Sequence, residues 1–339
     1  MKTHSKFKAM IKQLLGVTMA NMMLLPAVYA DYSMHPGSES FIKTMVEEHQ
    51  FDREWVVHIL QQAEPKQSIL DAMSRPAESV MTWGRYRKIF IQDSRIDQGV
   101  EFWKEHRETL ARAEREYGVP ASMIVGIIGV ETRFGRNKGS YRVVDALATL
   151  GFDFPRRSTF FLGQLEEYML MVREQKLQPF DLKGSYAGAM GFGQFIPSSY
   201  RAYAVDFDGD GQIDIVNNPV DAIGSVANYF KSHGWRKGQS VVSGAVLEKS
   251  VDQALFNTGL KPEKTILELS KAGIGSDSAL APELKATAMR LDGDDGDEYW
   301  IGLKNFYVIT RYNHSAMYAM AAYQLSELIA AQMPKVSGS

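Results

Sequence analysis

Residues 122–135 read SMIVGIIGVETRFG, an almost wholly apolar run with a single acidic residue, Glu131, close to its end. Pro120 stands just before the run, and proline suits the first turn of a helix, so a helix is expected to begin there. Residues three, four and seven positions apart share one face of a helix, as Ile124, Ile127, Ile128 and Glu131 would. The acid therefore continues an apolar face.

A carboxyl group on an apolar face loses hydration, and this loss raises its pKa above the ordinary value of about 4.3. Glu131 would then stay protonated near neutral pH and could act as a general acid. The alternative is that Glu131 lies at a frayed helix end and pairs with Arg133 or Arg136. The periodicity alone leaves both interpretations open.

The composition describes a globular protein. The chain has 339 residues, no cysteine, a formal net charge of −2, 45% hydrophobic residues and 23% charged residues. No charge bias points to nucleic acid or to an anionic membrane, and a chain of this length can bury a core in two or three lobes. Without cysteine there is neither a disulfide framework nor a thiol to carry a lipid anchor.

The first thirty residues have the pattern of a secretory signal peptide. Four lysines precede an apolar segment at 14–25, and cleavage is expected after Ala30. A retained membrane anchor is the alternative, but the apolar run is short and is interrupted by Thr18, Asn21 and Pro26. The prediction is export to a bacterial periplasm.

The remaining chain is predicted to be mainly α-helical, in an α+β fold. Beyond 1–30, the expected parts are an N-terminal helical lobe (31–118), a catalytic core (119–234), a small mixed α/β lobe (235–303) and a C-terminal helix that returns to the core (304–339). Helices are expected from the apolar spacing and the punctuating Gly and Pro residues at 99–117, 143–150, 158–175, 197–203, 221–233 and 314–331. The acidic stretch 292–297 is expected to be a hairpin turn.

Residues 183–200 are rich in Gly and Ala and contain Ser185, Gln194 and several aromatic residues. Small residues let the backbone approach a ligand closely, while the polar groups address hydroxyls and amides; tight helix packing is the alternative. No Lys-Ser or Lys-Thr follows the glycines, so this is not a phosphate-binding loop. Arg156 and Arg157 form a basic pair that is either solvated surface or a site for ligand carboxylates.

The loop that starts at Asp206 resembles the opening of an EF-hand. Acids occupy loop positions one, three and five (Asp206, Asp208, Asp210), and Gly211 occupies position six, where a sharp turn is needed. Asn217 replaces the usual Glu at position twelve. Either the site is weak, or Asp221 supplies the last carboxylate, or the loop is an acidic surface without metal.

Five motifs together resemble the lytic murein transglycosylase B family, glycoside hydrolase family 103. They are GVETRFG at 129–135, FPRR at 154–157, GSYAGAMGFGQFIPS at 184–198, DFDGDG at 206–211 and ITRYN at 309–313. The resemblance covers about 41–331 and implies a lysozyme-like core with a helical lobe and a small β-containing lobe. It also implies cleavage of the β-1,4 bond between N-acetylmuramic acid and N-acetylglucosamine in peptidoglycan.

The resemblance implies a role for each matching residue. Glu131 would be the catalytic acid and base, with Ser185 and Gln194 orienting the sugar. The residues implied to line the glycan groove are Tyr86, Arg156, Arg157, Tyr229, Tyr312, Asn313 and Tyr318. Those implied to bind a structural Ca²⁺ are Asp206, Asp208, Asp210, Gln212 through its carbonyl, and Asp221.

With Glu131 as the only nominated carboxyl group, the resemblance implies that the muramic acid C6 hydroxyl, and not water, completes the reaction and leaves a 1,6-anhydro ring. A hydrolytic muramidase that uses the same Glu131, and a calcium-stabilised glycan-binding protein without catalysis, are the alternatives. The expected partners are peptidoglycan strands and other cell-wall enzymes, with no nucleic acid and no organic cofactor. A monomer is expected. The absence of cysteine departs from the lipid-anchored members of the family.

Overall fold

The computed structural model describes residues 31–74 and 81–334, and helices predominate in this part of the chain. The α-helices are α1 (Ser38–Glu47), α2 (Arg53–Gln62), α3 (Gln67–Ser74), α4 (Trp83–Phe90), α5 (Asp93–Glu105), α6 (Arg107–Tyr117), α7 (Ala121–Thr132), α8 (Val143–Asp153), α9 (Ser158–Glu174), α10 (Pro197–Tyr203), α11 (Pro219–Ser232), α12 (Ile266–Lys271), α13 (Lys304–Tyr312) and α14 (Ala316–Gln332). The 3-10 helices are η1 (Tyr32–Met34), η2 (Pro155–Arg157) and η3 (Gln253–Leu255).

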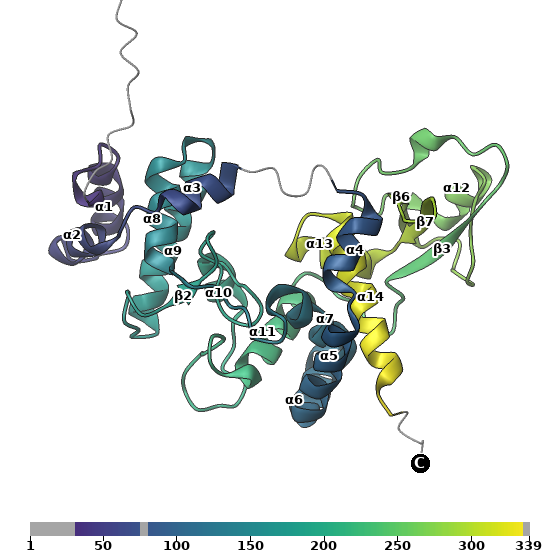
Figure 1. Ribbon diagram of the computed structural model, residues 1–339, viewed down its shortest axis with the longest axis horizontal. Helices are drawn as coiled ribbons and strands as arrows, with labels where there is room; N and C mark the ends of the chain where they lie inside the picture. Colours follow the sequence, from purple (N-terminus) through teal and green to yellow (C-terminus); the bar gives the residue numbers. More distant parts are fainter. Residues whose placement is uncertain (1–30, 75–80, 335–339) are drawn as a thin grey trace, which may run out of the picture.

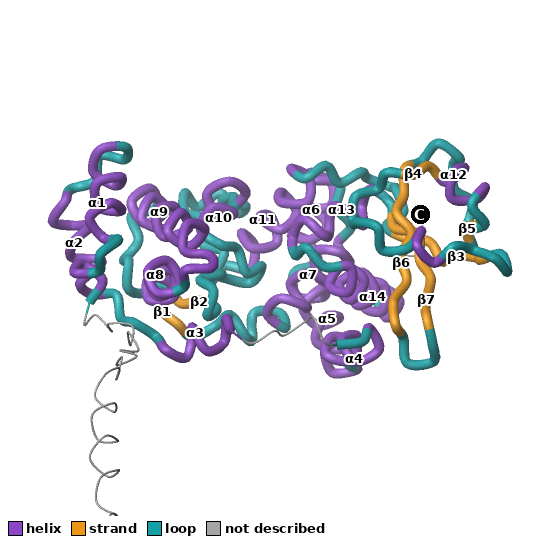
Figure 2. Tube along the Cα trace, turned by 90° about the horizontal axis from the view of Figure 1, so that it is seen from above, coloured by secondary structure: helices purple, strands orange, loops and turns teal. Residues whose placement is uncertain are grey.

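The strands are short. They are β1 (Tyr141–Arg142), β2 (Lys183–Gly184), β3 (Val242–Leu247), β4 (Lys264–Thr265), β5 (Ile274–Ser276), β6 (Lys285–Asp292) and β7 (Asp297–Gly302). Figure 2 shows that all strands except the β1–β2 pair gather at one end of an elongated molecule. The mainly helical α+β class predicted from the sequence is confirmed.

A first group of helices consists of α1–α3 with α8, α9 and α10, on one side of the molecule in Figure 1. α8 packs along α9, α3 packs on α8, and α10 packs on α9. Tyr32 of η1 is buried, and its hydroxyl donates to Asp153 Oδ2 at the end of α8 over 2.6 Å. The first described residues are therefore attached to helices more than a hundred positions away.

A second group surrounds α7, which packs against α5, α6, α11 and α14. Every residue of α7 except Ser122 and Glu131 is buried. This corrects the expected single apolar face, because a helix enclosed by other helices must be apolar on all sides. At Gly126 a Cβ atom would lie 2.8 Å from the Ala322 carbonyl oxygen, so α14 approaches the backbone of α7 closely.

The small lobe contains a five-stranded antiparallel sheet in the order β4-β6-β7-β3-β5. It has a hydrophobic cluster of its own, formed by Phe256, Ile266, Leu269, Ile274, Ala286, Ala288, Ile301 and Leu303. Asp292 ends β6 and pairs with Asp297, which begins β7. The hairpin turn predicted from the acidic stretch is confirmed.

The helices of 31–118 make their contacts in two places and not in one lobe. α1–α3 pack with η1 and α8, whereas α4 and α5 pack on α14 and α6 packs on α11. The single helix expected at 99–117 is two helices, because the backbone changes direction at His106 (φ −106°, ψ 25°). The C-terminal region is likewise two helices, of which α14 returns to α7.

Within residues 31–74 and 81–334, no helix has both the length and the apolar character required to span a membrane. The predicted signal peptide, 1–30, lies outside the described residues.

Candidate active site

Glu131 lies in the last turn of α7, partly exposed between the buried residues Val130 and Thr132. Burial raises the pKa of Glu131 to about 7, and a hydrogen bond from the Tyr318 hydroxyl to Glu131 Oε1 acts in the opposite direction. Desolvation therefore dominates. A group with this pKa is about half protonated at neutral pH, as a general acid requires.

The ion-pair interpretation of Glu131 is wrong. Arg133 donates instead to Gln98 Oε1 over 2.8 Å and to Ser94 Oγ over 2.9 Å. Arg136 lies 3.9 Å from Glu101. Both arginines thus interact with residues of α5. The carboxyl group of Glu131 instead accepts a hydrogen bond from Tyr318.

The chain leaves α7 through a turn in which Arg133, Phe134 and Gly135 all have positive φ (52°, 59° and 81°). Two non-glycine residues in the left-handed region cost about 1–3 kcal/mol each, so other contacts must stabilise the turn. Thr132 provides them: its hydroxyl lies 2.9 Å from the Phe192 carbonyl oxygen and accepts from the Gly135 amide over 2.9 Å. The end of α7 is thereby attached to the Gly-rich segment.

The Gly-rich segment lies directly against the residues that follow Glu131. At Gly139 a Cβ atom would be 2.5 Å from the Ser185 amide nitrogen, which leaves room only for glycine. The Gln194 side-chain amide donates to the Lys138 carbonyl over 3.3 Å and to the Gly191 carbonyl over 3.0 Å. Ser185 and Gln194 thus lie on a segment that contacts Lys138 and Gly139, a few residues after Glu131.

Ser185 and Gln194 both have local structural roles and retain polar capacity. Ser185 Oγ accepts from the amides of Ala187 (3.3 Å) and Ala189 (3.1 Å), so it stabilises a turn. Gln194 itself has a positive φ of 51°. Among the described residues, the Ser185 hydroxyl proton and Gln194 Oε1 have no hydrogen-bond partner, and these groups can address a ligand.

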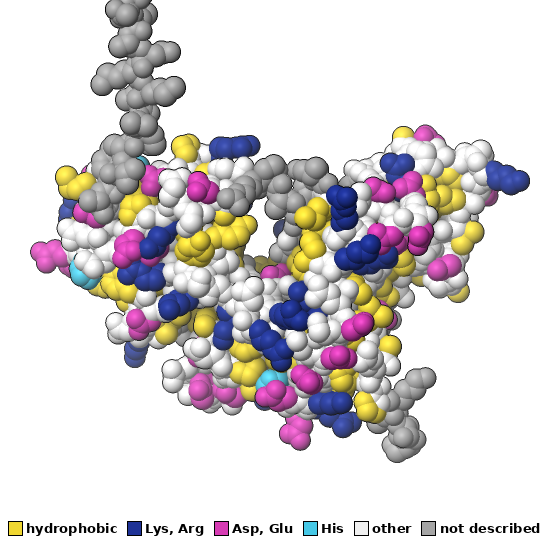
Figure 3. All heavy atoms as spheres, viewed as in Figure 1, with side chains coloured by type: hydrophobic (Ala, Val, Ile, Leu, Met, Phe, Trp, Pro, Cys, Tyr) yellow, Lys and Arg dark blue, Asp and Glu magenta, His cyan; other side chains and the backbone are white. Residues whose placement is uncertain are grey.

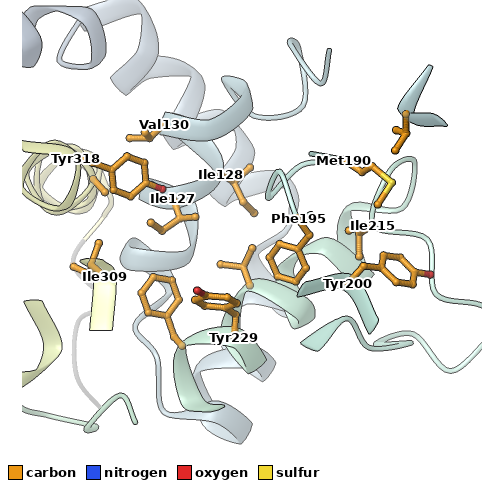
Figure 4. Close-up of a cluster of buried hydrophobic side chains, with 14 of the residues drawn as sticks. Ile127, Ile128, Val130, Met190, Phe195, Tyr200, Ile215, Tyr229, Ile309 and Tyr318 are labelled. Carbon is orange, nitrogen blue, oxygen red and sulfur yellow. The ribbon is translucent and has the colours of Figure 1, made fainter. Parts of the chain in front are cut away.

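Tyr318 and Tyr312 approach Glu131 from the C-terminal helices. Figure 4 shows Tyr318 on α14 directed towards the end of α7, near Val130. The pKa of each tyrosine is raised well above its ordinary value, first by burial and then by the charge of Glu131. The Tyr312 hydroxyl donates to the Gly193 carbonyl over 2.7 Å, so α13 also supports the Gly-rich segment.

Three of the tyrosines expected to line a groove are buried. Tyr318, Tyr86 and Tyr229 are 3%, 4% and 7% exposed, and the Tyr229 hydroxyl donates to the Arg311 carbonyl over 2.6 Å. Their ring faces are covered by protein in this structure. Tyr318 instead contacts the carboxyl group directly, so its observed position is that of a residue that orients Glu131.

The remaining residues of the expected groove are at the surface. Asn313 is exposed just after α13. Arg156 and Arg157 are exposed on η2, with the Arg157 guanidinium 4.4 Å from the Phe160 ring centroid. The two arginines belong to the first group of helices and Glu131 to the second. Figure 3 shows a hollow between these groups with hydrophobic side chains on both walls.

Asp206, Asp208 and Asp210 converge as the EF-hand pattern predicts. One carboxylate oxygen from each lies within 4.8 Å of the others, and Gly209 and Gly211 have positive φ (81° and 89°). Three hard oxygen ligands grouped at this separation fit a Ca²⁺ ion. Uncompensated by a cation, three carboxylates so close together would repel one another.

Asp221 is fully buried on α11 and is not one of the three converging acids. Its carboxylate accepts from the Phe207 amide over 2.7 Å and from the Asp214 amide over 2.8 Å, so it joins the two ends of the loop. The Asn217 side-chain amide donates to Asp214 Oδ2 over 3.2 Å, so Asn217 interacts outside the cluster of the three acids. Gln212 donates its amide to Asp210 Oδ1 over 2.8 Å.

The loop at 206–217, which we call the cation loop, is connected to the site of Glu131. Its last part accepts two hydrogen bonds, from the Phe192 amide to the Ile215 carbonyl (3.1 Å) and from Lys138 Nζ to the Val216 carbonyl (2.6 Å). At Gly191 a Cβ atom would lie 2.2 Å from the Ile215 oxygen. A disordered loop would therefore remove support from the Gly-rich segment.

The sequence analysis missed Thr132 and Lys138 as residues that build the site. Thr132 stands inside the motif that marks Glu131, but its partner is sixty positions away, and that of Lys138 is nearly eighty away. No local pattern signals such pairs.

A carboxyl group with a raised pKa, at a helix end that is hydrogen-bonded to a close-packed glycine-rich segment, is an arrangement suited to acid-catalysed cleavage of a glycosidic bond. The sequence model of one protein family, described as the transglycosylase SLT domain, matches residues 33–327. The chain belongs to this family, as the resemblance in the sequence predicted.

Relatives of this chain have similar length and fold. Membrane-bound lytic murein transglycosylase B of Escherichia coli (strain K12) is 48% identical over 309 residues, 88% of this chain and 84% of the relative. The catenated lytic transglycosylase SltB1 of Pseudomonas aeruginosa is 56% identical, with a TM-score of 0.86 over 89% of this chain and 99% of that chain.

Two further solved structures contain ligands. The Escherichia coli lytic transglycosylase Slt35, in complex with calcium, is 48% identical with a TM-score of 0.81 over 89% of this chain and 95% of that chain. SltB3 of Pseudomonas aeruginosa, in complex with NAG-NAM-pentapeptide, is 28% identical with a TM-score of 0.77 over 89% and 80%. The similarity supports the lysozyme-like fold expected from the sequence and marks this chain as an enzyme of the lytic transglycosylase class.

Proposed function

We propose that this protein is a peptidoglycan lytic transglycosylase that cleaves the β-1,4 bond between N-acetylmuramic acid and N-acetylglucosamine and leaves 1,6-anhydro ends. The observation that supports this reaction best is the solitary Glu131. Burial and Tyr318 account for its shifted pKa, and no second carboxyl group from residues 31–74 or 81–334 contributes to that shift. Hydrolytic glycosidases need two carboxyl groups, whereas an intramolecular attack by a sugar hydroxyl needs one group that acts twice.

In the first step, protonated Glu131 transfers its proton to the glycosidic oxygen as the bond from that oxygen to muramic acid C1 breaks. The N-acetyl carbonyl of muramic acid supports the positive charge that develops at C1. In the second step, the Glu131 carboxylate removes the proton of the C6 hydroxyl, and O6 forms a bond to C1. Glu131 is protonated again, and no water is consumed.

The polar groups of the Gly-rich segment would orient the sugar. The free proton of Ser185 suits an acetamido carbonyl, and Gln194 Oε1 suits a sugar hydroxyl. Across the hollow, Arg156 and Arg157 suit the lactyl or peptide carboxylates of the glycan. Tyr312 and Asn313 would complete the groove near the end of α13.

The loop at Asp206, Asp208 and Asp210 would bind a structural Ca²⁺, with the Gln212 carbonyl as a further ligand and Asp221 bound to the loop backbone. The ion would neutralise the acids and order the loop. The donor set and the relative that binds calcium support this assignment.

Export through a signal peptide at 1–30 would bring the protein to the periplasm, where its polymeric substrate lies. The lack of cysteine excludes a lipid on a thiol within this sequence, although a relative is membrane-bound. We expect a monomer that acts on peptidoglycan strands and meets other cell-wall enzymes there.

Mass spectrometry of digested peptidoglycan tests the reaction. We expect 1,6-anhydromuramic ends, whereas a hydrolytic muramidase would produce reducing ends heavier by one water. Glu131→Gln should abolish both products. Glu327→Gln is the control, because Glu327 also has a pKa raised by burial but lies on α14 outside the site. If Glu131→Gln clears cell walls like the parent, Glu131 is not the catalyst; if neither protein releases any product, the protein binds glycan without cleaving it.

A further inference from the structure

A second hollow, of about 640 Å³, lies in the small lobe and shares no residue with the site of Glu131. Its walls come from the loop after α11, the turn before β6 and the first turns of α13. In Figure 2, α13 lies between the sheet and the second group of helices. The volume is within the range of about 300–1,000 Å³ that is typical of small-ligand sites.

The hollow is strongly positive. Four cations line it (Arg236, Lys261, Lys285 and Lys304), with Glu283 as the one acid. In a chain of net charge −2, this is a local excess of three positive charges. Among the described residues, none of the four cations forms an ion pair within 4.0 Å. Lys285 also interacts at longer range with Glu268 of α12, and the remaining cations are free to attract an anionic ligand.

The walls between the cations are apolar or aromatic. Leu280, Leu284 and Leu303 contribute aliphatic surface, and Tyr307 contributes a partly buried ring. The Tyr307 hydroxyl has no hydrogen-bond partner among the described residues. An apolar body with positive groups around it suits a ligand that carries carboxylates on an aliphatic chain, more than a bare inorganic anion.

The backbone of the hollow is preorganised. Asn305 is fully buried, accepts from the Arg236 amide over 2.8 Å and donates to the carbonyls of Arg236 (2.9 Å) and Gln239 (2.8 Å). On the opposite wall, Lys285 Nζ donates to the Glu263 carbonyl over 3.0 Å. The backbone that carries Arg236 and the side chain of Lys285 are therefore held before a ligand arrives, which reduces the entropy cost of binding.

The hollow is extended and lies close to the active site. A smaller hollow of about 250 Å³ shares Lys261 and Tyr307 with it and adds Lys264 and Glu263. α13 runs from Lys304, at the hollow, to Tyr312, which donates to Gly193 beside Glu131. Eight residues of helix span about 12 Å. A ligand in the hollow would thus be separated from the proposed glycan site by the length of α13.

We propose that this hollow is a second, non-catalytic site that binds acidic peptides through their free carboxylates. The stem peptides of peptidoglycan belong to this class, so the biological ligand, though not the binding chemistry, rests on the proposed function. Binding there would retain a peptide-bearing strand while another part of it is at Glu131.

Isothermal titration calorimetry of Glu131→Gln protein with the free tripeptide L-Ala-γ-D-Glu-meso-diaminopimelate tests the site without sugar or turnover. We expect binding that Lys261→Glu and Lys304→Glu each weaken by about tenfold or more, and that salt weakens as well. Lys271→Glu, an exposed lysine of α12 outside the hollow, should change the Kd less than about twofold. The same peptide with its carboxylates amidated should not bind.

Activity assays separate this inference from the proposed function. Lys261→Glu in the active protein should release anhydro products from peptide-free glycan at the parent rate and from peptide-bearing glycan more slowly. If the tripeptide does not bind, or if the charge-reversed variants bind it like the parent, the second site is refuted even when anhydro products form. If the tripeptide binds but no anhydro product appears, the proposed reaction fails and the binding site stands.

Discussion

At the scale of single residues, Glu131 is in an environment that favours catalysis over stability. Its neighbours in α7 are buried, and within the described part of the chain its carboxyl group has one hydrogen-bond partner, Tyr318. Raising the pKa of a carboxyl group to about 7 means that the folded protein disfavours the ionised form. Active sites commonly impose such a cost on the fold.

Replacing Glu131 should therefore reveal that cost. Because the folded-state pKa lies above the unfolded value, the contribution of Glu131 to stability is fully present below pH 4.5 and is lost as the pH rises through about 7. At pH 8 we expect Glu131→Gln to have a free energy of unfolding about 1–3 kcal/mol higher than the parent, and at pH 4 to equal it. Urea unfolding at both pH values measures this difference; a variant that is less stable at pH 8 would contradict the assignment.

The Tyr318 hydroxyl should tune the acid. Its hydrogen bond favours the ionised form of Glu131 and lowers its pKa, so Tyr318→Phe should raise that pKa. Activity falls as pH rises through the pKa of the acid, and we expect the alkaline limb of kcat/KM to move to higher pH by about one unit or less. Tyr323→Phe, on the same helix and partly buried, should leave the limb unchanged. A profile identical in the parent and in Tyr318→Phe would show that Tyr318 has only a packing role.

At the scale of elements, the contact between α7 and α14 decides where the two halves of the site meet. α7 carries Glu131 and α14 carries Tyr318, and Gly126 permits their close approach. Since the nearest atom to an added Cβ belongs to the backbone of Ala322, a side chain at Gly126 cannot be accommodated by a rotamer change.

We expect Gly126→Ala to displace α14 and to reduce the free energy of unfolding by about 1–3 kcal/mol, together with a loss of kcat. Gly163→Ala in α9 is the matched control: nothing lies within 4 Å of its added Cβ, and alanine should stabilise that helix by about 0.5–1 kcal/mol. Thermal unfolding and turnover of the two variants can be compared directly. If the two variants were stabilised equally, the contact between α7 and α14 would not constrain the residue at position 126.

At the scale of the whole molecule, three distant segments converge on one site. The C-terminal end of α7, the Gly-rich segment and the last part of the cation loop are linked through Thr132, Phe192 and Ile215. The loop thus supports the site. An ion bound there should affect the stability of the fold more than the rate of the reaction.

Removal of calcium by a chelator is expected to lower Tm by about 5–10 °C while turnover at low temperature persists, because the proposed ion would stabilise the fold and would not polarise the scissile bond. Asp206→Asn should lower Tm without chelator and make it insensitive to chelator. Asp295→Asn, an acid in the other acidic turn, should behave like the parent. Differential scanning fluorimetry with and without chelator measures all three; a parent Tm that ignores the chelator would count against the metal site.

Local signals were sufficient for much of this protein. The apolar run and Pro120 predicted α7, Gly118 marked the end of the helix before it, and the alternation of acids with glycines predicted a loop whose three acids converge. Helix periodicity also predicted α10 with its observed bounds. These features depend on residues a few positions apart, where backbone geometry sets the outcome.

Contacts between distant residues were decided by the tertiary structure alone. Periodicity suggested one apolar face for α7, but enclosure by four other helices buries all of its sides. It also left the partner of Glu131 open between two nearby arginines, whereas the fold supplies Tyr318 from 187 positions away. Sequence by itself determined which residue types and local turns are present, because these follow from covalent geometry and short-range packing. Which groups meet, which tyrosines are buried and how far the pKa of Glu131 rises follow from desolvation by the assembled helices, and that exists only in the folded protein.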